Sequence, residues 1–130
     1  MADTLRENRA EDKGWYQITD LPEAPGNYAE SSASSMFVYM LSKAVNRGYL
    51  GESYGQAAIA AYRDLVDTFI NVEASGEVSL TNICAVAGLG FGRDGSYGYY
   101  MSEPVISNDP KGTGPFIMAG IQISQLLNQY

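Results

Sequence analysis

The stretch SSASSMFVYMLSKAVNRGYLGESYGQAAIAAYRDLVDTFIN, residues 31–71, decides the fold class. Its apolar residues recur at helical spacing twice in succession, which predicts one helix over 31–47 and a second over about 53–71. Gly48 is the natural end of the first helix, because glycine adopts the left-handed backbone that commonly terminates helices. The connection is so short that the two helices are expected to pack antiparallel as a helical hairpin.

Both predicted helices carry a wide apolar face, as expected for helices that bury one side against a neighbour. Ser31 or Ser32 can cap the first helix, and Lys43 and Arg47 suit its C-terminal end, where the helix dipole favours cations. The apolar face of the first helix comprises Ala33, Met36, Phe37, Met40, Leu41 and Ala44. The face of the second comprises Tyr54, Ala57, Ala58, Ala61, Tyr62, Leu65, Phe69 and Ile70. The hairpin therefore indicates a mainly α protein.

The segments around this hairpin are less regular. Residues 2–13 favour a frayed helix end, and the prolines and glycines of 14–27 favour a loop. The β-prone residues of 78–80 and 83–87 predict a small hairpin or extended excursion. Residues 88–114 are rich in glycine and tyrosine and are typical of a long ordered loop. Loops of this length are usually functional.

A last helix is expected after this loop, with Pro115 at its first position and Gly114 as its cap. Its apolar face comprises Phe116, Ile117, Gly120, Ile121, Ile123 and Leu127. Ala119 and Gly120 allow close approach by a neighbour. Three amphipathic helices make a thin core, so the faces of the 53–71 helix and of the last helix are expected to stay uncovered. Such faces favour a homo-oligomer.

Composition limits the classes of partner. The chain has 130 residues, enough for one domain, and 45% of them are hydrophobic, which argues against disorder. Eight Lys+Arg against 15 Asp+Glu give a net charge of −7. That charge repels phosphate backbones and anionic lipids, so nucleic acid and membrane surfaces are not expected partners. The first residues contain no apolar signal segment, and a cytoplasmic location is expected.

The residue types also exclude several chemistries. The sequence has no histidine, which removes the commonest general base and metal ligand. The single cysteine, Cys84, cannot form an internal disulfide, and its apolar neighbours favour a small buried thiol. The run 88–92 lacks the following helix that a dinucleotide-binding fingerprint requires, so its glycines are assigned to tight turns. Neither a metal site nor a cofactor is predicted.

The most site-like segment is 93–100, which combines an arginine, an aspartate and three tyrosines. Aromatic faces stack on sugar rings and arginine binds carboxylates, so this composition suits a sugar site. The same residues can also form an internal Arg93–Asp94 turn with the tyrosines packed on the helices, and both interpretations stay open. Residues 108–112 allow the same two interpretations, a sugar-binding site or a simple turn. The carboxylates that could serve a sugar hydrolase are Glu30, Asp94, Glu103 and Asp109, and none belongs to a self-sufficient signature.

Three segments, in this order, resemble the C-terminal region of glycoside hydrolase family 105, the unsaturated rhamnogalacturonyl hydrolases. The segments are Gly14–Gln17 leading to Gly26–Phe37; Val86–Gly90 followed by Arg93–Tyr97 and Tyr99–Tyr100; and Asn108–Gly112 with Gly114–Phe116. Together they span about residues 14–120. The related unsaturated glucuronyl hydrolases of family 88 share part of the pattern.

The resemblance implies an (α/α)6 barrel of the six-hairpin glycosidase type. It also implies a reaction that removes an unsaturated galacturonyl residue from the non-reducing end of pectin-lyase products. An aspartate protonates the double bond and assists addition of water, and the resulting hemiketal collapses without a metal or organic cofactor. The substrate-binding residues that the resemblance implies are Trp15, Tyr16, Gln17, Arg93, Asp94 and Tyr97.

The family's catalytic aspartates and its Trp-x-Arg-Gly-Asn-Gly-Trp segment lie upstream of the matched region, and this sequence contains neither. The expected fold is therefore mainly α: a partial (α/α)6 barrel of helical hairpins, with a small β excursion and a long Gly/Tyr-rich loop. Residues 1–130 are expected to form a single segment with its core at about 14–127. The expected function is the C-terminal segment of an unsaturated uronyl hydrolase, with no catalytic residue of its own and inactive alone. The alternative is a non-catalytic carbohydrate-binding or protein-interaction module.

Overall fold

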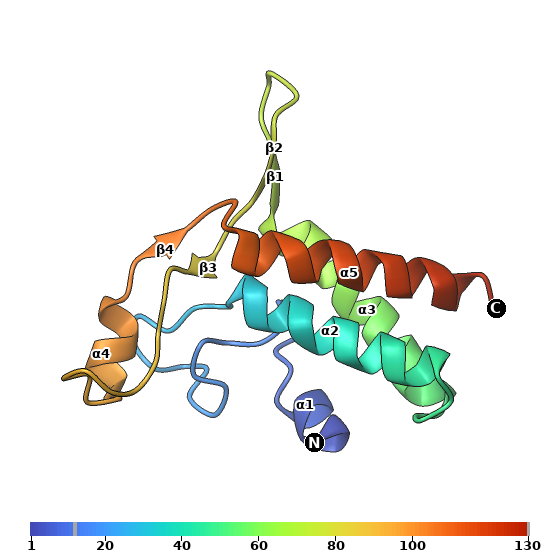
Figure 1. The fold of residues 1–130 in the computed structure, drawn as a ribbon, viewed down its shortest axis with the longest axis horizontal. Helices are drawn as coiled ribbons and strands as arrows, with labels where there is room; N and C mark the ends of the chain where they lie inside the picture. Colours follow the sequence, from blue (N-terminus) through green and yellow to red (C-terminus); the bar gives the residue numbers. More distant parts are fainter. Residues whose placement is uncertain (12, 130) are drawn as a thin grey trace.

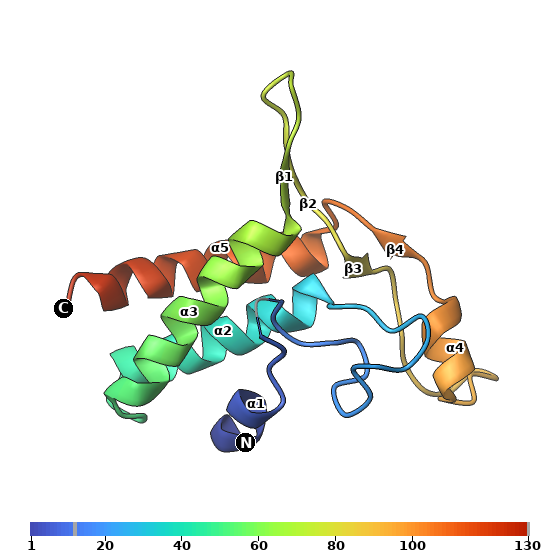
Figure 2. The same cartoon turned by 180° about the vertical axis from the view of Figure 1, so that it is seen from behind.

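The computed structural model describes residues 1–11 and 13–129, and long helices form its main body (Figure 1). These helices are α2 (Ser31–Asn46), α3 (Glu52–Phe69) and α5 (Pro110–Leu127). Helix α2 packs against both of the others, whereas α3 and α5 meet less extensively. Helix α3 runs back along α2 after a short turn, so the predicted helical hairpin and the mainly α fold are confirmed (Figures 1 and 2).

The two ends of α2 are formed by different means. Its N-cap is Glu30 and not Ser31 or Ser32, because the Glu30 carboxylate accepts a hydrogen bond from the Ala33 amide at 2.6 Å. The Ser31 hydroxyl instead donates a hydrogen bond to the Thr81 carbonyl oxygen at 2.7 Å, so it does not cap the helix. The C-terminal end agrees with the prediction, since Gly48 has a left-handed φ of +73°.

Apolar and small side chains join the three helices. The face of α3 that was expected to stay uncovered is largely buried in the core, with Ala58, Ala61 and Leu65 fully enclosed. Ala119 is also fully buried, and a Cβ atom on Gly120 would lie 2.5 Å from the Tyr62 hydroxyl. These observations confirm the predicted close approach of α5. On the other side of α5, Ile117 and Ile121 are exposed as expected. Phe116, which was expected to be uncovered with them, is partly buried and stacks on Tyr62 with ring centroids 5.3 Å apart.

Helix α3 passes directly into a β hairpin that projects from the body (Figure 2). Strand β1 (Ile70–Val72) pairs with β2 (Val78–Leu80), with Ile70 opposite Leu80. The β excursion is confirmed, although its first strand uses residues assigned to the end of the predicted helix. A second antiparallel pair joins β3 (Ile83–Cys84) to β4 (Val105–Ile106).

The long Gly/Tyr-rich segment contains a short helix, α4 (Tyr97–Ser102), as well as β4. Helix α5 then begins at Pro110, so the prediction that it starts at Pro115 was wrong. Gly112 and Gly114 suggested a loop, but both lie in the helix, and Gly112 serves packing. A Cβ atom on Gly112 would lie 2.6 Å from Ile83 Cδ1, so only glycine lets α5 approach β3 this closely.

The N-terminal segment completes the fold. Helix α1 (Ala2–Glu7) corresponds to the predicted frayed helix end, and the chain from 14 to 30 then wraps beyond the N-terminal end of α2 (Figure 1). Trp15 joins α1 to the core, because its indole N–H donates to the Leu5 carbonyl oxygen at 2.7 Å. Within the described residues, no helix is long and apolar enough to cross a membrane.

Candidate functional site

A groove of about 510 Å³ lies at the N-terminal ends of α2 and α5, beside strand β3. Chain segments far apart in the sequence form its walls. Its lining residues are Gln17, Glu30, Ser32, Ala33, Met36, Cys84, Val86, Ala87, Lys111 and Pro115. The floor is largely apolar, and a few polar side chains converge on it, which is the usual character of a small-molecule site.

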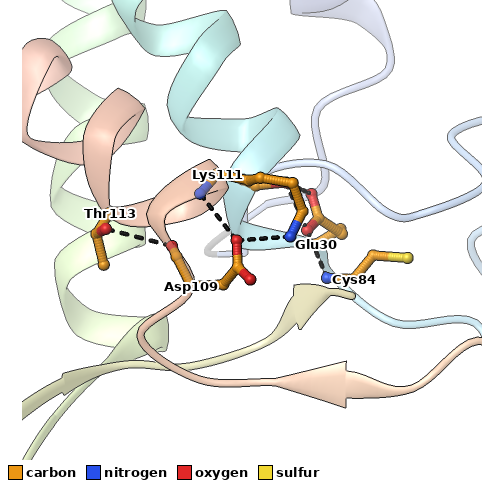
Figure 3. A network of polar contacts seen from close by, with 6 residues as sticks. Glu30, Cys84, Asp109, Lys111 and Thr113 are labelled. Atoms are coloured by element: carbon orange, nitrogen blue, oxygen red, sulfur yellow. Dashed lines mark hydrogen bonds and ion pairs between the residues drawn. The ribbon is translucent and has the colours of Figure 1, made fainter. Parts of the chain in front are cut away.

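Glu30 is the most constrained charged residue of the groove, being only 1% exposed. One carboxylate oxygen accepts a hydrogen bond from the Cys84 amide at 2.9 Å (Figure 3). The other accepts one from the Ala33 amide at 2.6 Å. The Ser32 hydroxyl donates to both oxygens, at 2.8 and 3.0 Å. Through these bonds the Glu30 carboxylate holds β3 against the start of α2, which is a structural role.

Lys111 is the cationic side chain of the groove. Its Nζ lies 2.6 Å from Asp109 Oδ1, which also accepts the Lys111 backbone N–H at 2.9 Å (Figure 3). The Lys111 ammonium and this backbone bond hold the pKa of Asp109 below its usual range. An ammonium has three donor protons, so Lys111 can bind an anionic substituent while it stays paired with Asp109.

The Cys84 side of the groove is weakly polar. The Gln17 amide nitrogen lies 3.5 Å from Cys84 Sγ, and the thiol is buried as predicted. The nearby Tyr28 hydroxyl is buried and has no hydrogen-bond partner in the described part of the chain. Burial, with a smaller contribution from the Cys84 thiol, raises the pKa of Tyr28 far above its ordinary value. Tyr28 therefore stays neutral at physiological pH.

The predicted substrate-binding residues of the first loop, 15–17, lie in three different environments. Trp15 is 1% exposed and packs edge-to-face on Phe37, with ring centroids 5.3 Å apart. It is a core residue and offers no face to a sugar. Tyr16 lines a separate polar hollow, and its backbone bridges to Ala29. Gln17 alone of this loop lines the groove.

The second predicted loop lies beyond the groove. The Asp94 carboxylate accepts the Ser96 N–H at 2.9 Å, and this bond lowers the pKa of Asp94. Asp94 therefore closes a local turn, with Ser96 as its partner rather than Arg93. Tyr97 donates its hydroxyl proton to the Pro25 carbonyl oxygen at 2.9 Å and so ties the two loops together. The Arg93 side chain is exposed.

Sequence reasoning did not assign Ser32 and Lys111 to the groove. Lys111 belongs to the 108–112 segment, for which site and turn were both open. The structure shows a helix start there, with Asp109 as the cap. Glu30 stood among the candidate carboxylates, but only its contact with Cys84, 54 residues away, reveals its structural role.

Comparisons with known proteins bear on this arrangement. The sequence pattern of Glycosyl Hydrolase Family 88 matches residues 1–127. Two curated relatives are Protein Atu3128 of Agrobacterium fabrum and a 24.9 kDa protein in the picA locus of Rhizobium radiobacter. Each is 44% identical over an alignment of 114 positions, and the match covers 81% of this chain and 48% of the relative. This chain therefore spans about half the length of the curated relatives it matches.

Solved structures share the fold over nearly the whole chain. A family 105 glycoside hydrolase from C. acetobutylicum ATCC 824 has a TM-score of 0.91 at 46% identity, covering 95% of this chain and 35% of that one. A possible family 105 member from Salmonella enterica has a TM-score of 0.75 at 26% identity, covering 99% of this chain and 30% of that one. These similarities confirm a partial fold of the six-hairpin glycosidase type. With the family pattern spanning 1–127, the chain belongs to glycosyl hydrolase family 88.

Proposed function

We propose that this chain is the C-terminal segment of an unsaturated uronyl hydrolase of the rhamnogalacturonyl type, acting on the products of pectin lyases. The observation that carries the proposal is the likeness to a family 105 glycoside hydrolase at 46% identity over 95% of the chain. The proposed substrate is an oligosaccharide that ends in an unsaturated uronic acid. In this role, residues 1–130 form one segment of the hydrolase domain, with its core at about 14–127.

The groove at the helix N-termini gives this segment a direct part in binding the sugar. The N-terminal ends of α2 and α5 are already capped by Glu30 and Asp109, so the positive charge available to a uronate comes from Lys111. Gln17 and Ser32 supply polar contacts to hydroxyl groups. Tyr16, Arg93, Asp94 and Tyr97 remain proposed as residues of the outer rim, whereas buried Trp15 is left out.

The chemistry itself is assigned to aspartates outside this segment. Three of the candidate carboxylates are committed to the backbone: Glu30 to two amides, Asp94 to Ser96, and Asp109 to Lys111. For Asp94 and Asp109 these bonds lower the pKa, which opposes a role as the acid that protonates the double bond of the substrate. Because the family's catalytic aspartates are expected upstream of the matched region, the 130-residue chain is proposed to be inactive alone and to need no cofactor.

Activity measurements on two proteins test this proposal. The 130-residue chain should leave the near-UV absorbance of an unsaturated rhamnogalacturonan disaccharide unchanged. A chimera of the C. acetobutylicum hydrolase, in which this chain replaces the matching segment, should remove that absorbance. Turnover by the chain alone would contradict the assignment of catalysis to other segments. A folded but inactive chimera would contradict the proposed function, provided that the parent hydrolase cleaves this disaccharide.

A matched pair of lysine variants isolates the groove. In the chimera, Lys111→Gln should raise KM about tenfold, because a charge-assisted hydrogen bond to the uronate is lost. Lys13→Gln makes the same charge change at an exposed position outside the groove lining and should leave KM unchanged. Self-association through the exposed face of α5 and a cytoplasmic location stay predictions of the same proposal.

A further inference from the structure

A second hollow lies at the opposite end of α2 from the groove and has no role in the proposed hydrolysis. Its volume is about 520 Å³. The lining residues all belong to the C-terminal half of α2 and the turn that follows: Tyr39, Met40, Lys43, Ala44, Arg47 and Tyr49. Two aromatic rings and two cations therefore meet in one hollow of about the volume of a small-ligand site.

The backbone of Tyr49 is hydrogen-bonded to the end of α2, although the residue is 80% exposed. Its backbone N–H donates to the Ala44 carbonyl oxygen at 2.8 Å, and Gly48 N–H donates to the Val45 carbonyl oxygen at 2.9 Å. With Gly48 in the left-handed region, these two bonds form a Schellman motif, which places Tyr49 just past the helix end. In this motif the residue after glycine commonly packs back on the helix, but here the ring remains largely in solvent.

Lys43 is held by a neighbouring tyrosine. Its Nζ lies 2.6 Å from the Tyr39 hydroxyl and 4.9 Å from the centre of the same ring. A nitrogen at these two distances sits beyond the hydroxyl end of Tyr39, so the ammonium does not cover the ring face. The ammonium has three protons and this contact uses one, which leaves donors for a ligand.

The charge of this hollow is opposite to that of the protein. Lys43 and Arg47 line it, and none of the described lining residues is acidic, whereas the whole chain carries a net charge of −7. Cations at a helix C-terminus stabilise the helix dipole, and this accounts for the two charges. It does not account for two tyrosines beside them, one of them largely exposed. Aromatic rings beside unshielded cations are suited to a ligand with both apolar faces and carboxylates.

We propose that this hollow is a second, non-catalytic binding site for acidic oligosaccharides. The ring faces of Tyr39 and Tyr49 would contact the C–H faces of the sugars, and Lys43 and Arg47 would bind the uronate carboxylates. A carbohydrate is favoured over an acidic peptide because the chain belongs to a glycosyl hydrolase family. The site is independent of the proposed hydrolysis, since binding here requires no catalytic residue.

Titration of the 130-residue chain with saturated trigalacturonate tests the site without any turnover. Backbone amide NMR shifts should concentrate in residues 43–50, and calorimetry gives the dissociation constant. Arg47→Gln and Tyr49→Ala should each weaken binding about tenfold, because each removes one principal contact. Arg63→Gln, the same charge change on the exposed surface of α3, should bind like the wild type. Galactotriose, which lacks carboxylates, should not bind.

Several outcomes would overturn the inference. Absence of shifts in 43–50, or wild-type affinity in both hollow variants, would show that the sugar does not bind there. Equal affinity for a polyglutamate peptide would show that the hollow recognises charge alone. Sedimentation velocity tests whether the hollow instead binds a second copy of the chain. If the wild type were a dimer and Tyr49→Ala a monomer, the hollow would be a self-association site. Tyr49→Ala should keep the wild-type melting temperature, which excludes misfolding as the cause of lost binding.

Discussion

The two ends of the molecule are stabilised in different ways. In the helical body, α2, α3 and α5 are joined by buried apolar and small side chains such as Leu41, Leu65 and Ala119. At the groove end, residues 14–30 form an irregular segment and 81–109 contain only α4, β3 and β4 as regular elements, and polar side chains hold much of the backbone. Asn27 shows this best: its amide nitrogen donates to the carbonyl oxygens of residues 18 and 21, at 2.9 and 2.7 Å.

The two ends therefore differ in which interaction holds them: apolar packing joins the helices, whereas hydrogen bonds position the backbone at the groove. Apolar burial is non-directional and tolerates small shifts, whereas a hydrogen bond fixes the direction of both partners. We therefore expect the helical body to contribute most of the stability, and the polar network at the groove end to fix the backbone around the site. Each of the following predictions tests one side of this division.

The largest effect is expected in the helical body. Leu65 is fully buried, so Leu65→Ala should lower the free energy of unfolding by about 2–5 kcal/mol through lost burial and the cavity left behind. Val66→Ala, at the neighbouring position that is 38% exposed, should cost less than about 1 kcal/mol. Urea denaturation of both variants gives the two values. Equal losses would mean that α3 is not packed as described.

An intermediate effect is expected from the polar link between the two ends. Glu30→Ala removes the acceptor for the Ala33 and Cys84 amides, so it should cost about 1–3 kcal/mol. Hydrogen exchange should accelerate at these two amides and leave the C-terminal half of α5 protected. Glu52→Ala, at an exposed position in the first turn of α3, is the control. Full protection of the Cys84 amide in Glu30→Ala would show that β3 is held to α2 by other contacts.

The smallest effect at neutral pH is expected from Tyr28→Phe. The Tyr28 hydroxyl is buried without a partner among the described residues, so its removal should change stability by less than about 1 kcal/mol. The pKa of Tyr28 is raised from 10.0 by burial, so the unfolded chain loses this proton before the folded chain does. Stability that is fully present below pH 10.0 should therefore decline as pH rises above it.

Thermal melts across the alkaline range check this pH dependence. The decline should be shallower in Tyr28→Phe than in the wild type, because the variant has no proton to lose at this position. Tyr49→Phe changes an exposed tyrosine in the same way and should follow the wild-type curve. If Tyr28→Phe also followed that curve, the Tyr28 hydroxyl would be accessible to solvent in the folded protein.

Sequence reasoning succeeded where the signal is local. The 3.6-residue periodicity identified α2 and α3, and Gly48 marked the end of α2, because helix formation and termination depend on residues a few positions apart. The order of short motifs also identified the glycoside hydrolase family, which the similarities confirm. These results needed no knowledge of which segments meet in space.

Only the tertiary structure decided the groove, the cap of α2 and the environment of Trp15. Glu30 replaced the serines as the cap because Cys84, 54 positions away, donates to the same carboxylate. The need for glycine at position 112 comes from Ile83, which lies against it, and Trp15 is buried because α1 and α2 enclose its ring. Each outcome depends on a contact between segments distant in sequence. Local propensity carries no information about such contacts, and burial and hydrogen bonding at these contacts outweigh the local preference.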